Sequence, residues 1–241
     1  MATLTWLFVA GAALAWLSVY GYLLLLAALR RPRPERRADD ALPHITVLMA
    51  TLDEAARIDA KLADLAHTDY PADKLRLLVV DGRSTDGTLE RLEAARAAGA
   101  MPLEILRAPQ ARSKLDQLRA GFAAVDDELV VTTDADGQLD PGCIRAVVEL
   151  LLADAHTAVA GARIRPVSEL LDERIYWWFL NTLWWLEGEA LAAAVVSGVC
   201  YGVRRRVALA TPRVSGADDV LFALAAGSQG HGVRLSRVAW A

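Results

Sequence analysis

The feature that most constrains this chain is an apolar stretch at its start. Residues 2–29 contain no charged side chain and consist mainly of Leu, Ala, Val and aromatic residues. Folded as a helix at about 1.5 Å per residue, the stretch would extend about 42 Å. About 20 residues already cross the hydrocarbon core of a bilayer. The stretch therefore predicts one transmembrane helix over residues 1–29.

Two other interpretations of this stretch fit less well. A cleaved signal peptide has a basic N-terminal region and an apolar region of about 7–15 residues. Here no basic residue precedes the stretch, and the stretch is longer. A buried core helix of a soluble protein would normally have a polar face. The sequence favours a retained membrane helix.

Five arginines follow the apolar stretch and determine its predicted orientation. Positively charged flanks remain on the cytoplasmic side of a membrane. We therefore expect an outside N-terminus, a single-pass anchor in the cell (inner) membrane, and a cytoplasmic domain. Together with two prolines, the arginines form a basic linker over residues 30–43. They are Arg30, Arg31, Arg33, Arg36 and Arg37.

The remainder of the chain is acidic. Residues 38–241 contain 21 Lys and Arg against 29 Asp and Glu. A domain of this charge does not suit nucleic acid, which requires a basic face, but it suits a divalent metal ion. Cys143 and Cys200 form no C-x-x-C pair, so the spacing indicates neither a zinc site nor a disulfide framework.

Beyond the linker, short apolar runs alternate with segments of helical periodicity. Runs at residues 45–50, 75–80, 103–106 and 129–133 indicate buried strands. The segments between them predict helices, the last of which opens at Asp140-Pro141 as N-cap and first helical residue. This alternation predicts an α/β domain over residues 44–241, with a mostly parallel sheet and helices on both faces. In such sheets, ligands bind beyond the carboxyl ends of the strands.

The second half contains an aromatic segment with two explanations. Trp177 and Trp178 recur seven residues later as Trp184 and Trp185, within residues 168–190. Paired tryptophans with flanking charges favour a helix that lies at the membrane interface. An aromatic-rich core helix is the alternative. The uncharged residues 190–203 that follow are too few to cross a membrane.

Acidic residues follow three of the predicted strands. A capping box would explain the first group, and ordinary turn chemistry the second. The third group is a D-A-D sequence, in which two carboxylates of an extended chain point the same way and repel each other unless a cation is present. Mg²⁺ typically takes one or two carboxylates together with phosphate oxygens. The groups contain Thr51, Asp53 and Glu54; Asp81 and Ser84; and Asp134 and Asp136.

Six segments in a fixed order carry the most specific signal. They are Ile45-Thr-Val-Leu-Met-Ala-Thr-Leu-Asp-Glu54, Asp81-Gly-Arg-Ser-Thr-Asp-Gly-Thr88, Ser113-Lys-Leu-Asp-Gln-Leu-Arg-Ala-Gly121, Thr133-Asp-Ala-Asp136, Gly198-Val-Cys-Tyr-Gly-Val-Arg-Arg205 and Ala217-Asp-Asp219. In order and spacing they resemble the family 2 glycosyltransferases of the GT-A type. The resemblance extends from about residue 44 to residue 238.

The resemblance implies that a sugar is transferred from a nucleotide-diphosphate sugar to a lipid or glycan acceptor at the cytoplasmic membrane face. Residues 44–140 would form the nucleotide-sugar half, and residues 141–241 the acceptor half with an interfacial helix at 168–190. Asp219 would be the general base, and Asp134 and Asp136 would bind Mg²⁺ or Mn²⁺. The donor would contact Thr51, Asp53, Glu54, Asp81, Ser84, Lys114 and Asp134. The acceptor region would contain Gly198, Arg204, Arg205 and Asp218.

Membrane-bound members of that family usually continue to a Gln-x-x-Arg-Trp motif and further transmembrane helices. Because the sequence ends at Ala241, we expect it to be truncated at its C-terminus. Two other functions remain open. A nucleotidyltransferase would require a glycine-rich basic loop after the first strand, whereas residues 51–57 are acidic and contain no glycine. A non-catalytic membrane protein would retain the fold without the activity.

Overall fold

The computed structural model describes residues 2–29, 34–190, 193 and 195–241, and its centre is a seven-stranded sheet of order β3-β2-β1-β4-β6-β5-β7. β6 pairs antiparallel with β4 and β5, whereas all other described neighbours pair in parallel. The predicted, mostly parallel α/β sheet is therefore confirmed. The strands are β1 (Ile45–Thr51), β2 (Leu75–Asp81), β3 (Leu103–Arg107), β4 (Leu129–Thr133), β5 (Thr157–Arg163), β6 (Cys200–Arg204) and β7 (Gly232–Trp240).

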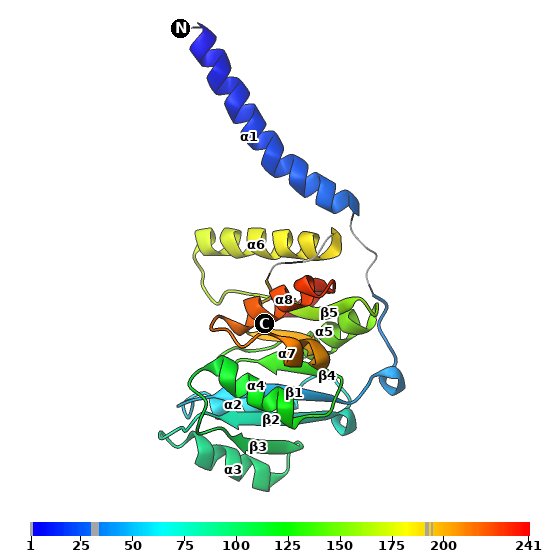
Figure 1. Cartoon of the computed structure of the whole chain (residues 1–241). Helices are drawn as coiled ribbons and strands as arrows, with labels where there is room; N and C mark the ends of the chain where they lie inside the picture. Colours follow the sequence, from blue (N-terminus) through cyan, green and yellow to red (C-terminus); the bar gives the residue numbers. More distant parts are fainter. Residues whose placement is uncertain (1, 30–33, 191–192, 194) are drawn as a thin grey trace.

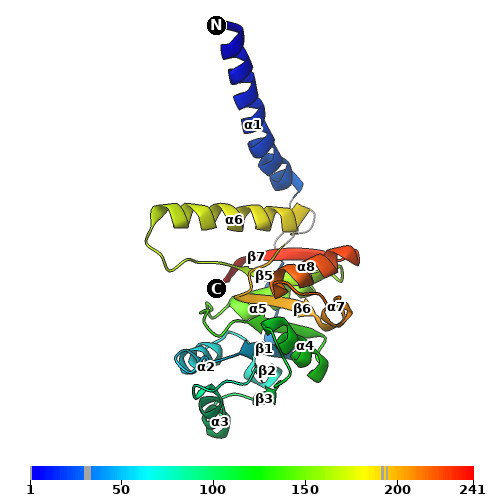
Figure 2. The ribbon, with the colours of Figure 1, turned by 60° about the vertical axis from the view of Figure 1, so that its left-hand side comes forward.

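Helices cover both faces of the sheet (Figures 1 and 2). Successive residues of a strand point to opposite faces. In β1, Val47 and Met49 accordingly join the core beneath α2, α3 and α5, and Leu48 joins the core beneath α4, α7 and α8. These helices are α2 (Ile58–Ala66), α3 (Thr88–Ala98), α4 (Lys114–Ala124), α5 (Cys143–Leu152), α7 (Arg205–Ala210) and α8 (Asp218–Ser228); the 3-10 turns are η1 (Asp39–Ala41) and η2 (Ala72–Lys74).

Helix α1 (Ala2–Leu29) projects away from the domain (Figure 1). By length and composition, its segment Thr3–Leu29 can cross a membrane. Its apolar side chains are mostly exposed, with Leu26 near the domain a buried exception. A helix that is apolar all round and packs so little against its own domain is suited to an apolar environment.

The end of the basic linker packs on the domain. The Arg36 guanidinium lies 2.9 Å from a carboxylate oxygen of Asp69, and the Arg37 N–H donates to Glu149 over 2.9 Å. Four linker residues lie outside the described part of the chain: Arg30, Arg31, Pro32 and Arg33.

Helix α6 (Leu171–Ala190) lies crosswise between α1 and the rest of the domain in both views, and Figure 2 shows the edge strand β7 beside it (Figures 1 and 2). Two polar contacts fix it to the domain. The Asn181 side chain accepts from the N–H of Ile164 over 3.0 Å and donates to its carbonyl over 2.8 Å. The carboxylate of Glu189 pairs with the Arg234 guanidinium at 2.8 Å, and both side chains are buried. The helix is therefore part of the domain rather than a loose attachment.

The two explanations of the tryptophan segment apply to different halves of α6. In the C-terminal half, Trp184 and Trp185 pack against the sheet core. In the N-terminal half, Leu171, Ile175 and Trp178 are 69%, 56% and 65% exposed, in a stripe at i, i+4 and i+7 spacing. The helix is thus both a core helix and a carrier of exposed apolar side chains.

Two helix starts considered from the sequence are not observed. The capping box that would explain Thr51 and Glu54 does not form, because Thr51 is the last residue of β1 and α2 begins only at Ile58. Asp140 does not cap α5, which begins at Cys143; its carboxylate instead pairs with Arg165 at 2.9 Å.

Candidate active site

The parallel pairing of β1, β2 and β4 brings the three acidic groups to one edge of the sheet. Thr51 lies opposite Asp81, and Met49 lies opposite Thr133, so all three strands end together. This agrees with the expected position of a ligand site at the carboxyl ends of the strands.

The first two acidic loops hold each other by hydrogen bonds. The carboxylate of Asp81 accepts the N–H groups of Arg83 (3.0 Å) and Ser84 (3.2 Å). The Ser84 hydroxyl accepts the N–H of Asp53 over 2.9 Å, and the Asp53 carboxylate accepts the N–H of Thr85 over 2.7 Å. Both Asp53 (φ 57°) and Arg83 (φ 82°) adopt the left-handed backbone region. Strain of this kind persists only where surrounding contacts determine the loop.

The predicted donor ligands in these loops are therefore brought together, but they already have protein partners. Glu54 follows the same pattern, because its carboxylate lies 3.0 Å from the Arg57 guanidinium and its N–H donates to Thr88 over 2.8 Å. The carboxylates of Asp53 and Asp81 shape the loops, which leaves the loop surface to present a fixed outline to a ligand.

Gln117, on α4, supports this edge from below and was not predicted. Its side-chain amide donates to the carbonyls of Thr51 (2.7 Å) and Val80 (3.3 Å), and the residue is buried. A Cβ at Gly82 would overlap this amide, which explains the glycine at that position. The sequence offered no signal for Gln117, because a glutamine between Lys114 and Gly121 looks like any polar helix residue.

Lys114 joins the third acidic loop to helix α8. Its Nζ lies 2.6 Å from Asp134 Oδ1 and 3.1 Å from Asp218 Oδ1. Asp218 also accepts the hydroxyl proton of the buried Tyr201 over 2.6 Å. Burial acts to lower the pKa of Lys114, but the carboxylates of Asp218 and Asp134 outweigh it and raise the pKa. Lys114 is therefore a firmly protonated group between two acidic elements.

Gly198 marks the point where these groups converge. A Cβ placed there would lie 3.3 Å from Asp219 Oδ2, 3.6 Å from Asp134 Oδ2 and 3.7 Å from Lys114 Nζ. The other oxygen of Asp219 accepts the N–H of Val220 over 2.8 Å, which orients the carboxylate. Burial, and then the nearby charge of Asp218, raise the pKa of Asp219. A glycine here keeps open the space that these side chains share.

The D-A-D loop fits a metal ion that brings its own phosphate ligands. Burial raises the pKa of Asp134, while Lys114 opposes this and the charges of Asp218 and Asp136 add to it. Asp136 is exposed and makes no hydrogen bond or ion pair with a described residue. Within the described ranges, no three or more His, Cys, Asp or Glu side chains are grouped to hold a metal. Two carboxylates alone suit Mg²⁺ or Mn²⁺ shared with a diphosphate, not a closed protein cage.

Arg204 and Arg205 do not reach this edge, which corrects their predicted place in the acceptor region. Because β6 runs antiparallel, Cys200 lies opposite Thr133 whereas Arg204 lies opposite Leu129, at the other end of β4. Five residues of strand span about 17 Å. The Arg204 guanidinium donates to the carbonyls of Leu151 and Thr157, and Arg205 donates to that of Phe122. Both arginines stabilise the opposite edge of the domain.

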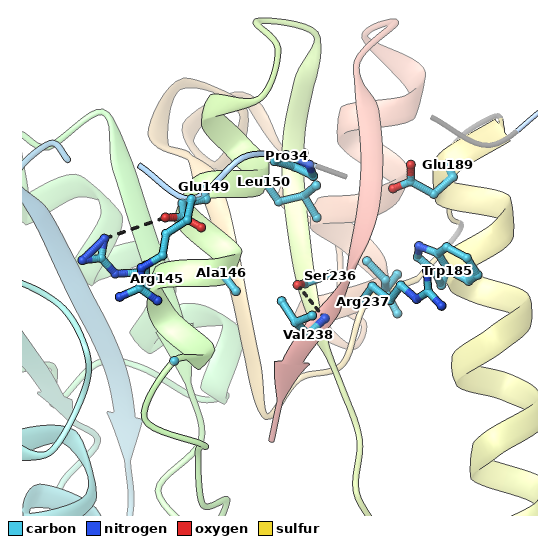
Figure 3. Close-up of a pocket in the computed structure, with 13 residues that line it drawn as sticks. Pro34, Arg145, Ala146, Glu149, Leu150, Trp185, Glu189, Ser236, Arg237 and Val238 are labelled. Atoms are coloured by element: carbon cyan, nitrogen blue, oxygen red, sulfur yellow. Dashed lines mark hydrogen bonds and ion pairs between the residues drawn. The ribbon is translucent and has the colours of Figure 1, made fainter. Parts of the chain in front are cut away.

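A cavity of about 620 Å³ lies elsewhere, between the linker, α5, β7 and α6 (Figure 3). No predicted site residue lines it. Its charged residues are mostly paired within the protein, Arg145 with Glu149 at 3.8 Å and Glu189 with Arg234. The converging charged groups therefore lie at the sheet edge, not in this cavity.

Sequence comparison places most of the domain in one family. Residues 46–207 match the sequence model described as Glycosyl transferase family 2. The probable glycosyltransferase YdaM of Bacillus subtilis (strain 168) is 24% identical over 190 residues, which cover 76% of this chain and 44% of that protein. The chain thus spans less than half the length of this curated relative.

Solved structures share the fold. The mannosyltransferase PcManGT from Pyrobaculum calidifontis, in complex with GDP-Man and Mn²⁺, superposes with a TM-score of 0.79 at 26% identity, covering 97% of this chain and 67% of that one. S. aureus TarS 1-349 gives a TM-score of 0.62 at 16% identity, covering 82% and 60%. Glucosyl-3-phosphoglycerate synthase from Mycobacterium tuberculosis, with Mn²⁺ and UDP, gives 0.55 at 20% identity, covering 89% and 72%.

Proposed function

Because the chain belongs to glycosyl transferase family 2, we propose that it transfers a sugar from a nucleotide-diphosphate sugar to a lipid or glycan acceptor. The observation that carries the proposal is the convergence of Lys114, Asp134 and Asp219 on the space kept open by Gly198. This arrangement combines a cation, a metal-ligand carboxylate and a carboxylate base within one site.

The donor diphosphate would bind over the D-A-D loop. Asp134 and Asp136 would hold Mg²⁺ or Mn²⁺, and when bound the ion would supply the positive charge that stabilises a departing diphosphate. Lys114 would donate to a diphosphate oxygen in exchange for one of its two carboxylates. The bound GDP-Man and Mn²⁺ of PcManGT and the UDP-GlcNAc of a TarS complex support this class of donor.

Asp219 would act as the general base on the acceptor. Its Oδ2 would take the proton from the acceptor hydroxyl. At the same time the hydroxyl oxygen would form a bond to the anomeric carbon of the sugar, and the bond between that carbon and the diphosphate would break. A pKa raised by burial makes the ionised Asp219 a stronger proton acceptor than an exposed carboxylate. Asp218, bonded to Lys114 and Tyr201, would position this site without touching the acceptor proton.

The membrane would lie against α1 and α6. With α1 as a single-pass anchor in the cell membrane and the arginines behind it inside, the domain would be cytoplasmic. The exposed apolar stripe of α6 would then lie at the interface. A hydrogen bond of 3.1 Å from the Tyr22 hydroxyl to Glu187 joins the two helices and supports this common placement.

Release of nucleoside diphosphate tests the activity. The full chain would be incubated in turn with UDP-glucose, UDP-GlcNAc and GDP-mannose, with Mn²⁺ and a bacterial lipid extract. We expect one donor to release its diphosphate, and EDTA or Asp219→Asn to abolish the release. Donor binding without any release in the parent chain would support the non-catalytic alternative.

Tag accessibility tests the orientation. A tag at Met1 should be accessible from outside intact cells, and a tag at Ala241 should not. The reverse pattern would contradict the cytoplasmic assignment.

A further inference from the structure

A second, smaller pocket lies at the same edge of the sheet as the acidic site, and it has the opposite charge. Its volume is about 190 Å³, and it is formed where β5, α6 and β7 meet. The side chains that give it its character are three arginines and three tryptophans. They are Arg163, Arg165, Arg174, Trp177, Trp178 and Trp240.

The positive charge of this pocket is incompletely neutralised. The guanidinium of Arg163 stacks on the Trp240 ring at 4.8 Å, and its buried Nε has no hydrogen-bond partner among the described residues. Arg165 stacks on the same ring at 5.1 Å and pairs with Asp140. Neither Arg163 nor Arg174 forms an ion pair with a described residue. A buried guanidinium N–H group requires an acceptor, and an anion bound in the pocket would supply one to Arg163.

A further arginine strengthens this field. Arg237 stacks on Trp185 at 5.1 Å, as Figure 3 shows from the side of the larger cavity. Burial, and then the positive charge of Arg237, lower the pKa of Arg163. Two like charges beside one another, with no carboxylate of a described residue paired with Arg163, favour an anion from outside the domain.

The position of the pocket connects it to the proposed transfer site. Trp240 lies opposite Arg163 at the carboxyl end of β5. Asp140, in the loop that follows the D-A-D sequence, donates its N–H to the Trp240 carbonyl over 3.0 Å and accepts from Arg165. An anion in the pocket would therefore sit beside the loop that carries Asp134 and Asp136.

The other side of the pocket borders an apolar surface. Its α6 residues 174, 177, 178 and 181 follow i, i+3, i+4 and i+7 spacing and form one helix face. Trp178 belongs both to this face and to the exposed stripe with Leu171 and Ile175. A ligand with a phosphate in the pocket can thus lay an apolar chain along α6.

We propose that this arginine–tryptophan pocket binds the phosphate headgroup of a membrane lipid on the acceptor side of the site. The assignment rests on the proposed function only for the acceptor role of that lipid. Arginine forks match phosphate oxygens in pairs. The lipid chain along α6 distinguishes this ligand from free phosphate, which would use the same arginines without the apolar stripe.

Binding of three probes tests the proposal with the detergent-solubilised full chain, without donor or metal: farnesyl phosphate, farnesol and inorganic phosphate. We expect farnesyl phosphate to bind at least about tenfold more tightly than either of the others. Arg163→Gln and Arg174→Gln should each weaken its binding about tenfold, the range of a charge-assisted hydrogen bond. Arg206→Gln, the same charge change at the opposite edge, should stay within about twofold of the parent.

Several results would overturn the proposal. The first is parent-like binding of farnesyl phosphate by both Arg163→Gln and Arg174→Gln. The second is an affinity for inorganic phosphate equal to that for farnesyl phosphate, which would indicate a free-anion site. The third is an affinity for farnesol equal to that for farnesyl phosphate. Arg174 is exposed, so its variant should fold even if Arg163→Gln does not. Because donor and metal are absent, failure here leaves metal-dependent nucleotide binding untouched, and failure of nucleotide binding leaves this result standing.

Discussion

The two proposed halves of the domain, a nucleotide-sugar (donor) half over residues 44–140 and an acceptor half over residues 141–241, hold their functional groups in different ways. In the nucleotide-sugar half, hydrogen bonds in and between short loops fix the edge of the sheet. The Asp81 carboxylate, for example, accepts the N–H groups of Arg83 and Ser84. In the acceptor half, side chains distant in sequence do this: Glu189 pairs with Arg234, and Asp218 pairs with Lys114 of the other half. A short loop can be recognised from its sequence motif, whereas a pair of residues distant in sequence has no such motif. The loops could therefore be predicted from the sequence, and the distant pairs are known only from the structure.

Asp219→Asn should give the largest effect, because it removes the proposed base from the acceptor half and leaves the donor half intact. We expect turnover to fall by about 10² to 10⁴, with donor affinity and melting temperature unchanged. Diphosphate release and nucleotide titration measure the two halves separately.

Asp218→Asn is the matched control for that variant. Asp218 is buried and bonded to Lys114 and Tyr201. Its loss should lower the melting temperature while activity falls less. If Asp218→Asn were inactive and Asp219→Asn active, Asp218 would be the base and Asp219 the positioning residue.

Glu189→Gln tests whether a distant pair fixes α6 to the acceptor half. Among the described residues, the change leaves the buried Arg234 with Asp154, at 3.4 Å, as its remaining ionic partner. We expect a loss of about 3 kcal/mol in unfolding free energy, since breaking a buried pair typically costs about 3–5 kcal/mol. Glu173→Gln, in the exposed N-terminal half of the same helix, should change the free energy of unfolding by less than about 0.5 kcal/mol. Equal stability of the two variants would contradict the role of the pair of Glu189 and Arg234 in fixing α6 to the domain.

Gly82→Ala tests the local support of the donor half. The new methyl group would displace the Gln117 amide from the Thr51 carbonyl, at a cost of about 1–3 kcal/mol. Combining it with Gln117→Ala should cost less than the sum of the single changes, because the shortened side chain makes room. Gly142→Ala is the control, since its Cβ would meet open space. Additive losses in urea unfolding would contradict the proposed contact.

The smallest effect concerns pH. Asp219 must be ionised to act as a base, and its pKa is raised. As the pH is lowered, kcat/KM should therefore begin to fall at a higher pH than it would for an ordinary aspartate. Asp218→Asn removes a charge that raises this pKa and should shift that limb to lower pH. Stability should change in the opposite direction to activity. A carboxyl group whose pKa is raised in the folded state stabilises the fold below its unfolded-state pKa, and this stabilisation is lost as the pH rises through the folded-state pKa. A limb that stays in place in Asp218→Asn would argue against Asp219 as the titrating group.

The donor half shows how far sequence reasoning reaches. Buried β1, β2 and β4 are rich in Val, Leu and Ile, and Asp and Gly at their tips mark the turns, so strands and loops were predicted at nearly their observed positions. What the pattern missed is that Asp53 and Asp81 bind backbone N–H groups of the loops themselves. Hydrogen-bond partners of this kind depend on a register that only the folded loops define.

The acceptor half shows where it fails. β5 reads Thr-Ala-Val-Ala-Gly-Ala-Arg, and small residues of this kind give a weak strand signal. Arg204 and Arg205 were assigned to the acceptor region because the segment from Gly198 to Arg205 resembles one in the family, but an antiparallel strand carries them to the opposite edge. The arginines that do reach the carboxyl edge, Arg163 and Arg165, are separated from the acidic motifs by a helix and a strand.

Calorimetric titration of a nucleoside diphosphate tests the central claim most directly, namely that the D-A-D edge binds the donor with a divalent metal. UDP and GDP would each be titrated into the full chain with Mn²⁺ or with EDTA. We expect one of them to bind at least about tenfold more tightly with Mn²⁺, and Asp136→Ala to lose this difference, because it removes the proposed metal ligand, which has no protein partner among the described residues. Equal affinity with and without Mn²⁺ in the parent chain, or full metal dependence in Asp136→Ala, would contradict the claim.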